Sequence, residues 1–203
     1  MAGLRGMIFT VLTGEDADVD GKADGDVHGM LLAVGGSGKT KSGINLTKAA
    51  AKLGVSRRTV ERWVQSANTG TGQRPSAGHA KELAKKSRQA ATTIAGRREA
   101  LQASSIAKAI TRRGARIAIE GLQGPVVNGK DYRRFRTTMV ELDPVTAQAM
   151  LDAWVAGGDK GYMAWATGFW GGTEAEDANY LPDWAFGELS SIELQQPYGG
   201  RWH

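Results

Sequence analysis

The chain has 203 residues, a hydrophobic content of 41% and a net charge of +5, enough for one sizeable core or two small domains. It has no cysteine, which excludes disulfides and thiolate metal sites and fits the cytoplasmic location that we expect. The 3 histidines are far apart in sequence, so no zinc site is expected. The longest apolar-aromatic stretch, residues 162–170, is far shorter than the ~20 residues that cross a bilayer, so we expect no membrane partner.

The charges are segregated along the chain. Residues 1–34 carry 2 basic and 6 acidic side chains, and residues 137–203 carry 2 basic and 10 acidic ones. The stretch between them, residues 35–136, has 22 basic and 5 acidic side chains, a net charge of +17. This segregation predicts a central face that binds a polyanion, flanked by acidic segments.

The acidic, Gly-rich N-terminal segment, residues 1–43, contains a loop that nearly matches a calcium-binding loop. The matching positions are Asp16, Asp18, Asp20, Gly21 and Asp24. Val27 stands where the twelfth position needs a bidentate acid, so the cage is not expected to close around calcium.

Residues 44–77 are predicted to form a helix-turn-helix DNA-binding domain followed by a linker. The stretch 49–64 reads AAAKLGVSRRTVERWV, with helical runs over 46–53 and 56–65. Ala50 is small where the second helix crosses, and Gly54 can take a positive φ at the turn. Ser56 is a good N-cap. A shared core is expected from Leu53, Val55, Val60 and Trp63.

The polar residues of the second helix are the predicted DNA-binding site, since its first residues would enter the major groove. Arg57 and Arg58 can reach guanine edges or phosphates, and Ser56 and Thr59 can hydrogen-bond phosphates. Arg62, one turn later, is suited to a backbone contact or to an ion pair with Glu61. An ordinary helical hairpin with a solvated basic face is the alternative.

Residues 33–40, AVGGSGKT, resemble a phosphate-binding P-loop in which Ala33 replaces the first glycine. Lys39 would bind the β/γ-phosphates and Thr40 would bind magnesium. The neighbouring helix-turn-helix favours a second interpretation, a flexible basic arm that touches the DNA backbone.

The rest of the chain predicts a basic linker helix over 78–114, which ends at Arg112, Arg113 and Gly114. A C-terminal domain over 115–203 is predicted as β-β-α-α-β, with strands near 117–119, 134–139 and 192–194. Its helices carry an aromatic stripe that is expected to be core, and Asp143-Pro144 caps the first of them. The fold class is therefore α+β. Arg133, Arg134 and Arg136 are possible additional DNA contacts or a solvated face.

Several of these elements together resemble the telomere terminal protein (Tpg) family of linear actinobacterial replicons. They are GVSRRTVERWV, the ARI strand at 115–117, the helix DPVTAQAMLDAWVAG and the closing strand, and the resemblance covers most of residues 44–196. It implies binding to the telomeric DNA at replicon ends and priming of DNA synthesis from a side-chain hydroxyl. It also implies a DNA polymerase and a telomere-associated protein as partners.

The family's priming threonine lies in the loop after the ARI strand. The matching stretch, 122–130, reads LQGPVVNGK and contains no hydroxyl; the nearest hydroxyls belong to Tyr132, Thr137 and Thr138. Tyr132 is the candidate catalytic residue, because its neighbours Asp131 and Arg133 could tune it. We expect no tightly bound cofactor, with Mg²⁺ required if priming occurs.

Two other functions compete with terminal priming. The chain could be a helix-turn-helix transcriptional or plasmid-maintenance regulator, with the C-terminal domain forming a homodimer. It could also be an enzyme that turns over nucleotides at residues 33–40.

Overall fold

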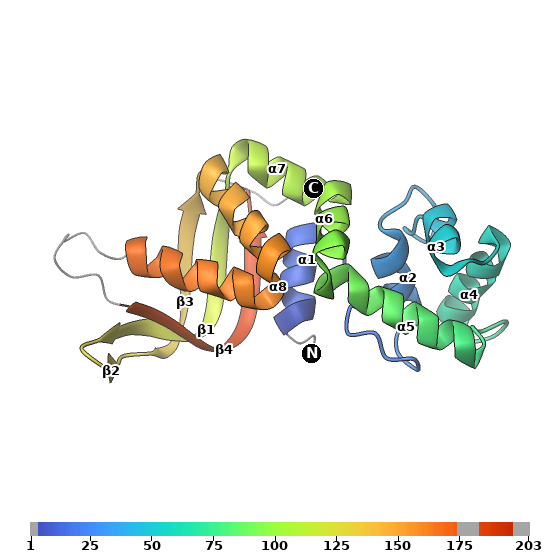
Figure 1. Ribbon diagram of the computed structural model, residues 1–203, viewed down its shortest axis with the longest axis horizontal. Helices are drawn as coiled ribbons and strands as arrows, with labels where there is room; N and C mark the ends of the chain where they lie inside the picture. Colours follow the sequence, from blue (N-terminus) through green and yellow to red (C-terminus); the bar gives the residue numbers. More distant parts are fainter. Residues whose placement is uncertain (1–3, 174–182, 197–203) are drawn as a thin grey trace. The chain divides into compact units, whose positions relative to one another are not determined.

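The computed structural model describes residues 4–173 and 183–196, and it confirms a mixed α+β fold (Figure 1). The chain divides into two compact units, residues 1–105 and 106–203. The helices are α1 (Leu4–Thr13), α2 (Val27–Gly35), α3 (Leu46–Leu53), α4 (Arg57–Thr69), α5 (Ala77–Thr92), α6 (Ile94–Ala103), α7 (Ser105–Arg113) and α8 (Pro144–Thr173). The strands are β1 (Ala115–Val127), β2 (Lys130–Asp131), β3 (Arg134–Leu142) and β4 (Asp183–Gln195).

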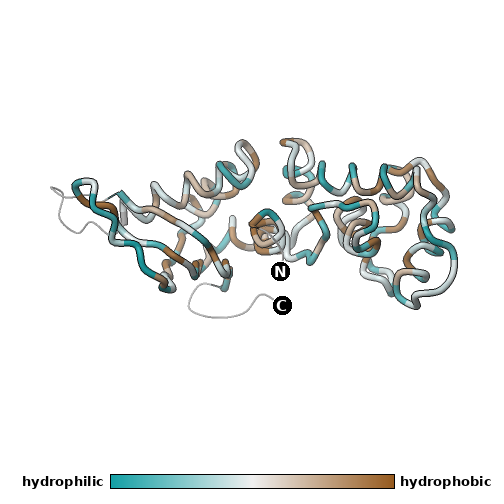
Figure 2. The backbone as a smooth tube through the Cα atoms, turned by 90° about the horizontal axis from the view of Figure 1, so that it is seen from below, coloured by the Kyte–Doolittle hydropathy of each residue, from teal (hydrophilic) through white to brown (hydrophobic). Residues whose placement is uncertain are grey.

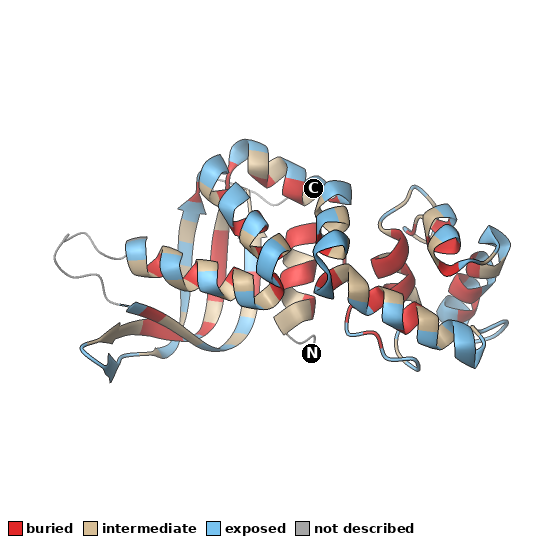
Figure 3. Cartoon of the chain, viewed as in Figure 1, coloured by how far each residue is buried: buried red, intermediate tan, exposed pale blue. Residues whose placement is uncertain are grey.

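The core of the first unit is shared by α2, α3, α4 and α5. Most of α2 is buried (Figure 3), and it packs against the other three helices. Hydrophobic and hydrophilic stretches alternate along the helices of both units (Figure 2), as amphipathic helices require. Trp63 is 2% exposed and Val60 is fully buried, so the core predicted for the second helix of the motif is confirmed.

The turn between α3 and α4 has the predicted chemistry. Gly54 adopts φ 65° and ψ 31°, the left-handed region that a residue with a Cβ enters only with strain. The backbone N–H of Val55 then donates to the carbonyl of Ala50, which closes the end of α3. Ser56 caps α4, because its hydroxyl oxygen accepts a hydrogen bond from the N–H of Thr59 at 3.1 Å.

The prediction of one long basic helix over 78–114 is wrong. The stretch forms three helices, α5, α6 and α7, broken at Thr93 and Ser104, which both have extended backbone angles. Each break is stabilised by a side-chain hydrogen bond that competes with helix continuation. Thr93 Oγ1 accepts from the N–H of Gly96, and Ser104 Oγ donates to the carbonyls of Leu12 and Thr13 in α1.

The sheet of the second unit is antiparallel, with β1 between β3 and β4 and the short β2 pairing with the end of β1. Strand β1 runs to Val127, so most of the stretch 122–130 that was matched to a loop is strand. The turn itself is Asn128-Gly129, where both residues have positive φ. A bulge at Gly121 breaks the register with β4, and a Cβ at that position would meet the carbonyl of Glu188.

Helix α8 packs on the sheet (Figure 1) and begins as predicted. Asp143 Oδ1 accepts from the N–H groups of Val145 and Thr146, and Pro144 is the first helical residue. Gly158 is non-helical, with φ 61° and ψ −144°, so α8 is two helices across a kink, as the predicted β-β-α-α-β order requires. The aromatic stripe lies in the core at Trp154 and Tyr162, which are fully buried.

We predict that Trp63→Ala destabilises the first unit by about 3–5 kcal/mol, because it leaves a cavity where α4 meets the core. Chemical denaturation followed by circular dichroism measures this loss. Gln65→Ala, at an exposed position of the same helix, is the control and is expected to change stability by less than about 0.5 kcal/mol. Equal midpoints for the two variants would contradict the packing described here.

Candidate nucleic-acid interface

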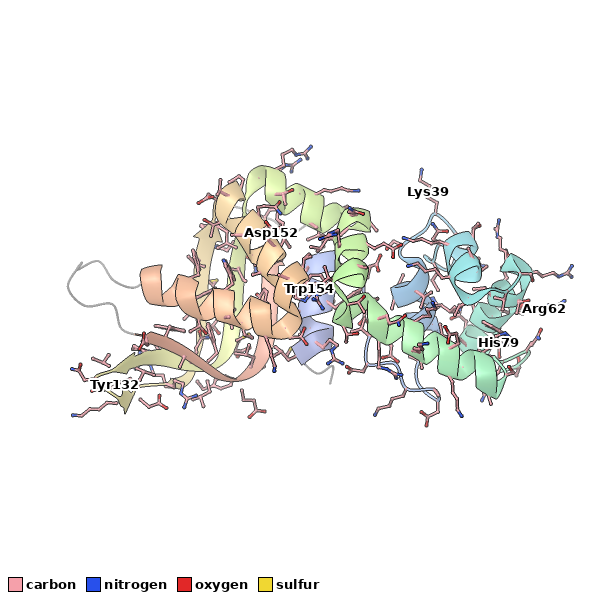
Figure 4. All side chains as sticks on the ribbon, in the orientation of Figure 1. Lys39, Arg62, His79, Tyr132, Asp152 and Trp154 are labelled. Carbon is pink, nitrogen blue, oxygen red and sulfur yellow. The ribbon has the colours of Figure 1, made fainter. Side chains whose placement is uncertain are left out.

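The polar residues at the start of α4 lie on the surface of the first unit. Ser56, Arg57, Arg58 and Arg62 are exposed and Thr59 is half-buried. Arg62 points away from the core in Figure 4. The cap at Ser56 and the buried face of α4 orient this row outward, so the helix can present it to a groove.

The arginines of α4 have different partners. Arg57 Nε donates to Glu61 Oε1 at 2.9 Å, an exposed i,i+4 pair. Arg62 donates to Gln73 Oε1 at 3.3 Å, so the predicted pairing of Arg62 with Glu61 is wrong. Helical spacing explains why Glu61 pairs with Arg57 and not with Arg62, since residues four apart lie on one face of a helix whereas adjacent residues do not. Among the residues that the structure describes, Arg58 has no partner, which leaves its guanidinium available to a ligand.

The lysines of α3 are neutralised by an acid from a distant part of the first unit. Glu99 on α6 pairs with Lys48 at 3.0 Å and with Lys52 at 2.7 Å. Burial by itself raises the pKa of Glu99, but the hydrogen bonds and charges of Lys52 and Lys48 outweigh it and hold the pKa below its ordinary value of 4.5. Sequence reasoning missed this pairing, because 47 residues separate Glu99 from Lys52 and no local pattern links them.

Residues 33–40 do not form a P-loop. The segment begins inside helix α2, not after a strand, and α3 starts six positions after Thr40. Backbone N–H groups that a P-loop would offer to phosphate are bonded within the protein: Gly38 donates to Gly43 and Ser37 to the carboxylate of Glu15. Thr40 Oγ1 donates to the carbonyl of Ile44, a bond within the same segment.

The three arginines after β2 do not form one cationic edge. Arg133 is bound by Asp131 through Nε and Nη2, and these hydrogen bonds hold the pKa of Asp131 below its usual value. Arg136 lies over the ring of Trp184, with its Cζ 5.4 Å from the ring centroid. Arg134 is exposed. The predicted cluster therefore reduces to one outward cation, with the other two engaged in structural contacts.

Tyr132 lies in the short break between β2 and β3, which both pair with β1, and it is 52% exposed. Its backbone N–H donates to the carbonyl of Pro125 in β1 at 3.0 Å, which places the residue next to the pairing of Val126 with Asp131. Within the described ranges, no residue hydrogen-bonds its hydroxyl. The neighbours Asp131 and Arg133 bind each other, and among the described residues neither hydrogen-bonds the Tyr132 hydroxyl.

The calcium-like loop is folded by its own carboxylate. Asp18 Oδ1 accepts from the N–H groups of Asp20 and Gly21. Residues 4–173 and 183–196 contain no cluster of three or more His, Asp or Glu that could hold a metal ion. In the same part of the chain, none of the helices has the length and hydropathy of a membrane span.

Residues 39–75, which include α3, the Gly54 turn and α4, match the homeodomain-like domain of helix-turn-helix type. This match and the observed geometry indicate a DNA-binding domain, and duplex DNA is accordingly the partner that the motif indicates. No curated protein and no solved structure matches the chain.

We predict that Glu99→Gln lowers the thermal midpoint of the first unit at pH 7, and that its difference from the unaltered protein disappears as the pH falls below 4.5. A carboxylate whose pKa is depressed by folding stabilises the protein above its unfolded pKa, and the gain is lost as the pH falls through the folded pKa. The shift should be small, since this pair is partly exposed. A midpoint difference that is constant from pH 7 to pH 3 would contradict it.

Proposed function

We propose that this chain is a sequence-specific DNA-binding protein that places the first turns of α4 in the major groove. The observation that carries the proposal is the outward row of polar residues at the start of α4, above a core that fixes the helix. Arg58 would read a guanine edge, because it has the guanidinium geometry for two hydrogen bonds and no competing partner within the described structure. Ser56 and Thr59 would bind phosphate.

Arg57 and Arg62 have secondary roles in this proposal. Arg57 would exchange its bond to Glu61 for a phosphate or a base, at small cost because the pair is exposed. Arg62 is bonded to Gln73 in the linker, so a contact of Arg62 with the DNA backbone would also position that linker.

We expect Arg58→Ala to lose about 1–3 kcal/mol of discrimination between the preferred duplex and a duplex with one changed base pair. Selection from a random duplex library would identify the preferred site, and fluorescence anisotropy would measure both affinities. Arg98→Ala, which removes an equal charge at an exposed position of α6, should leave the discrimination unchanged. If the two variants discriminate alike, Arg58 does not read bases.

For the biological setting, we propose a terminal protein of linear replicons, on the strength of the resemblance over residues 44–196. In this role Tyr132 would provide the hydroxyl, since its side chain is exposed and its hydroxyl makes no hydrogen bond in the described structure. Thr138 is less suited, because its hydroxyl donates to Gln123 and accepts from Trp170. A DNA polymerase and a telomere-associated protein would be the partners.

The priming step would join the Tyr132 oxygen to the α-phosphorus of the first nucleotide and release pyrophosphate, while the phenolic proton passes to a base. Mg²⁺ arriving with the triphosphate would neutralise its charge. The protein itself contributes the exposed hydroxyl and, through α4, the attachment to DNA near the start site.

The covalent adduct tests this role directly. Incubation with labelled dNTP, polymerase and replicon-end DNA should label the protein, and Tyr132→Phe should abolish the label while duplex binding is retained. Thr137→Val, another exposed hydroxyl position, is the matched control and should remain labelled. Labelling that survives Tyr132→Phe would assign priming to another residue, and binding without any label would exclude it.

A regulator that acts as a homodimer is the second candidate, favoured by exposed apolar side chains on β1 and β3. Leu122 and Phe135 face each other across the two strands, and Met139 lies four residues further along β3 on the same face. A face of this kind suits a second copy, and dimers read paired half-sites one helical turn apart. Sedimentation with palindromic DNA would distinguish this candidate, since it requires a dimer and produces no adduct.

A further inference from the structure

The loop between α2 and α3 carries two exposed lysines, Lys39 and Lys41. Lys39 points away from the helices in Figure 4. The loop is closed by a bridge between Ser37 and Ile44, and Gly38 donates to the carbonyl of Gly43 at 2.8 Å. The two cations therefore stand on a short hairpin-like turn that leads directly into α3.

This turn, residues 37–44, is held in place by side chains from other parts of the first unit. Glu15, 8% exposed, accepts hydrogen bonds from both the N–H and the hydroxyl of Ser37. The ring of His28 in α2 contacts the carbonyl of Ser42 at 3.2 Å. Buried and half-buried groups therefore hydrogen-bond the turn at both ends.

The lysines of the turn differ from the lysines of α3 and from Arg57 in having no acidic partner among the described residues. Lys48 and Lys52 on α3 are both bound to Glu99, and Arg57 is bound to Glu61. Across residues 4–173 and 183–196, no carboxylate pairs with Lys39 or Lys41. Two unneutralised ammonium groups on an ordered turn form a patch that suits an anion.

We infer that Lys39 and Lys41 bind phosphates of the duplex backbone beside the groove that α4 occupies. In a helix-turn-helix the first helix of the motif crosses the DNA backbone, and the turn leads into that helix, α3. This inference rests on the proposed function and adds a second contact to it. Phosphate is also present in free nucleotides, but the N–H groups of Ser37 and Gly38 that would surround a nucleotide phosphate are already bonded within the protein.

The test is the salt dependence of duplex binding, measured by anisotropy between about 50 and 200 mM salt. Loss of two phosphate contacts in K39A/K41A should lower the slope of log affinity against log salt by about 1.8. The same fold-loss is expected on preferred and scrambled duplexes, since phosphate contacts carry no sequence information. K39R/K41R should restore the slope.

The control variant is K81A/K85A, which removes two exposed lysines from α5 of the same unit and should keep the slope. The inference would be overturned if the salt slope fell equally in K39A/K41A and K81A/K85A, or if it stayed unchanged in K39A/K41A. Either result would leave duplex binding by α4 intact. Calorimetric titration with ATP tests the other source of phosphate. If ATP releases heat only when Lys39 and Lys41 are present, and the salt slope of duplex binding does not change in K39A/K41A, the turn binds nucleotides. A chain that binds no duplex would overturn the proposed function as well.

Discussion

The crossing of α3 and α4 is the constraint on which the candidate interface depends. Gly54 takes a left-handed conformation, and this allows the chain to reverse within a few residues and bring Val60 and Trp63 against the core. Because these side chains are buried, the opposite face of α4 points toward solvent. The outward position of Arg58 is therefore a consequence of apolar packing and a single backbone angle, with no contribution from its charge.

Pairing decides which cations of the first unit can act on a polyanion. The central segment is strongly basic, yet Glu99 and Glu61 bind three of the cations nearest to the motif. An exposed ion pair costs little to break, so these cations can still contribute to the long-range field. Arg58 and Lys39 have no carboxylate partner in the described structure. They can therefore bind a polyanion without first breaking an ion pair.

The second unit combines a structural aromatic core with an exposed hairpin. Trp170 joins α8 to the sheet, because its Nε1 donates to Thr138 and its ring meets Phe186 edge-on. Beyond this core the hairpin of β1, β2 and β3 carries Tyr132 and Phe135 as exposed side chains. Priming or dimerisation by this unit would therefore use the hairpin, which α8 and the rest of the sheet support.

Local sequence determined the helix-turn-helix, the caps at Ser56 and Asp143, the Gly158 kink and parts of strands β1, β3 and β4, because each follows from near neighbours along the chain. Tertiary structure decided which charges are neutralised, where the basic helix breaks and how the segment 33–40 folds. Glu99 reaches Lys52 and Glu15 reaches Ser37 across many residues, and Ser104 ends a helix by bonding α1. Such contacts depend on packing between elements distant in sequence, and no periodicity or spacing records them.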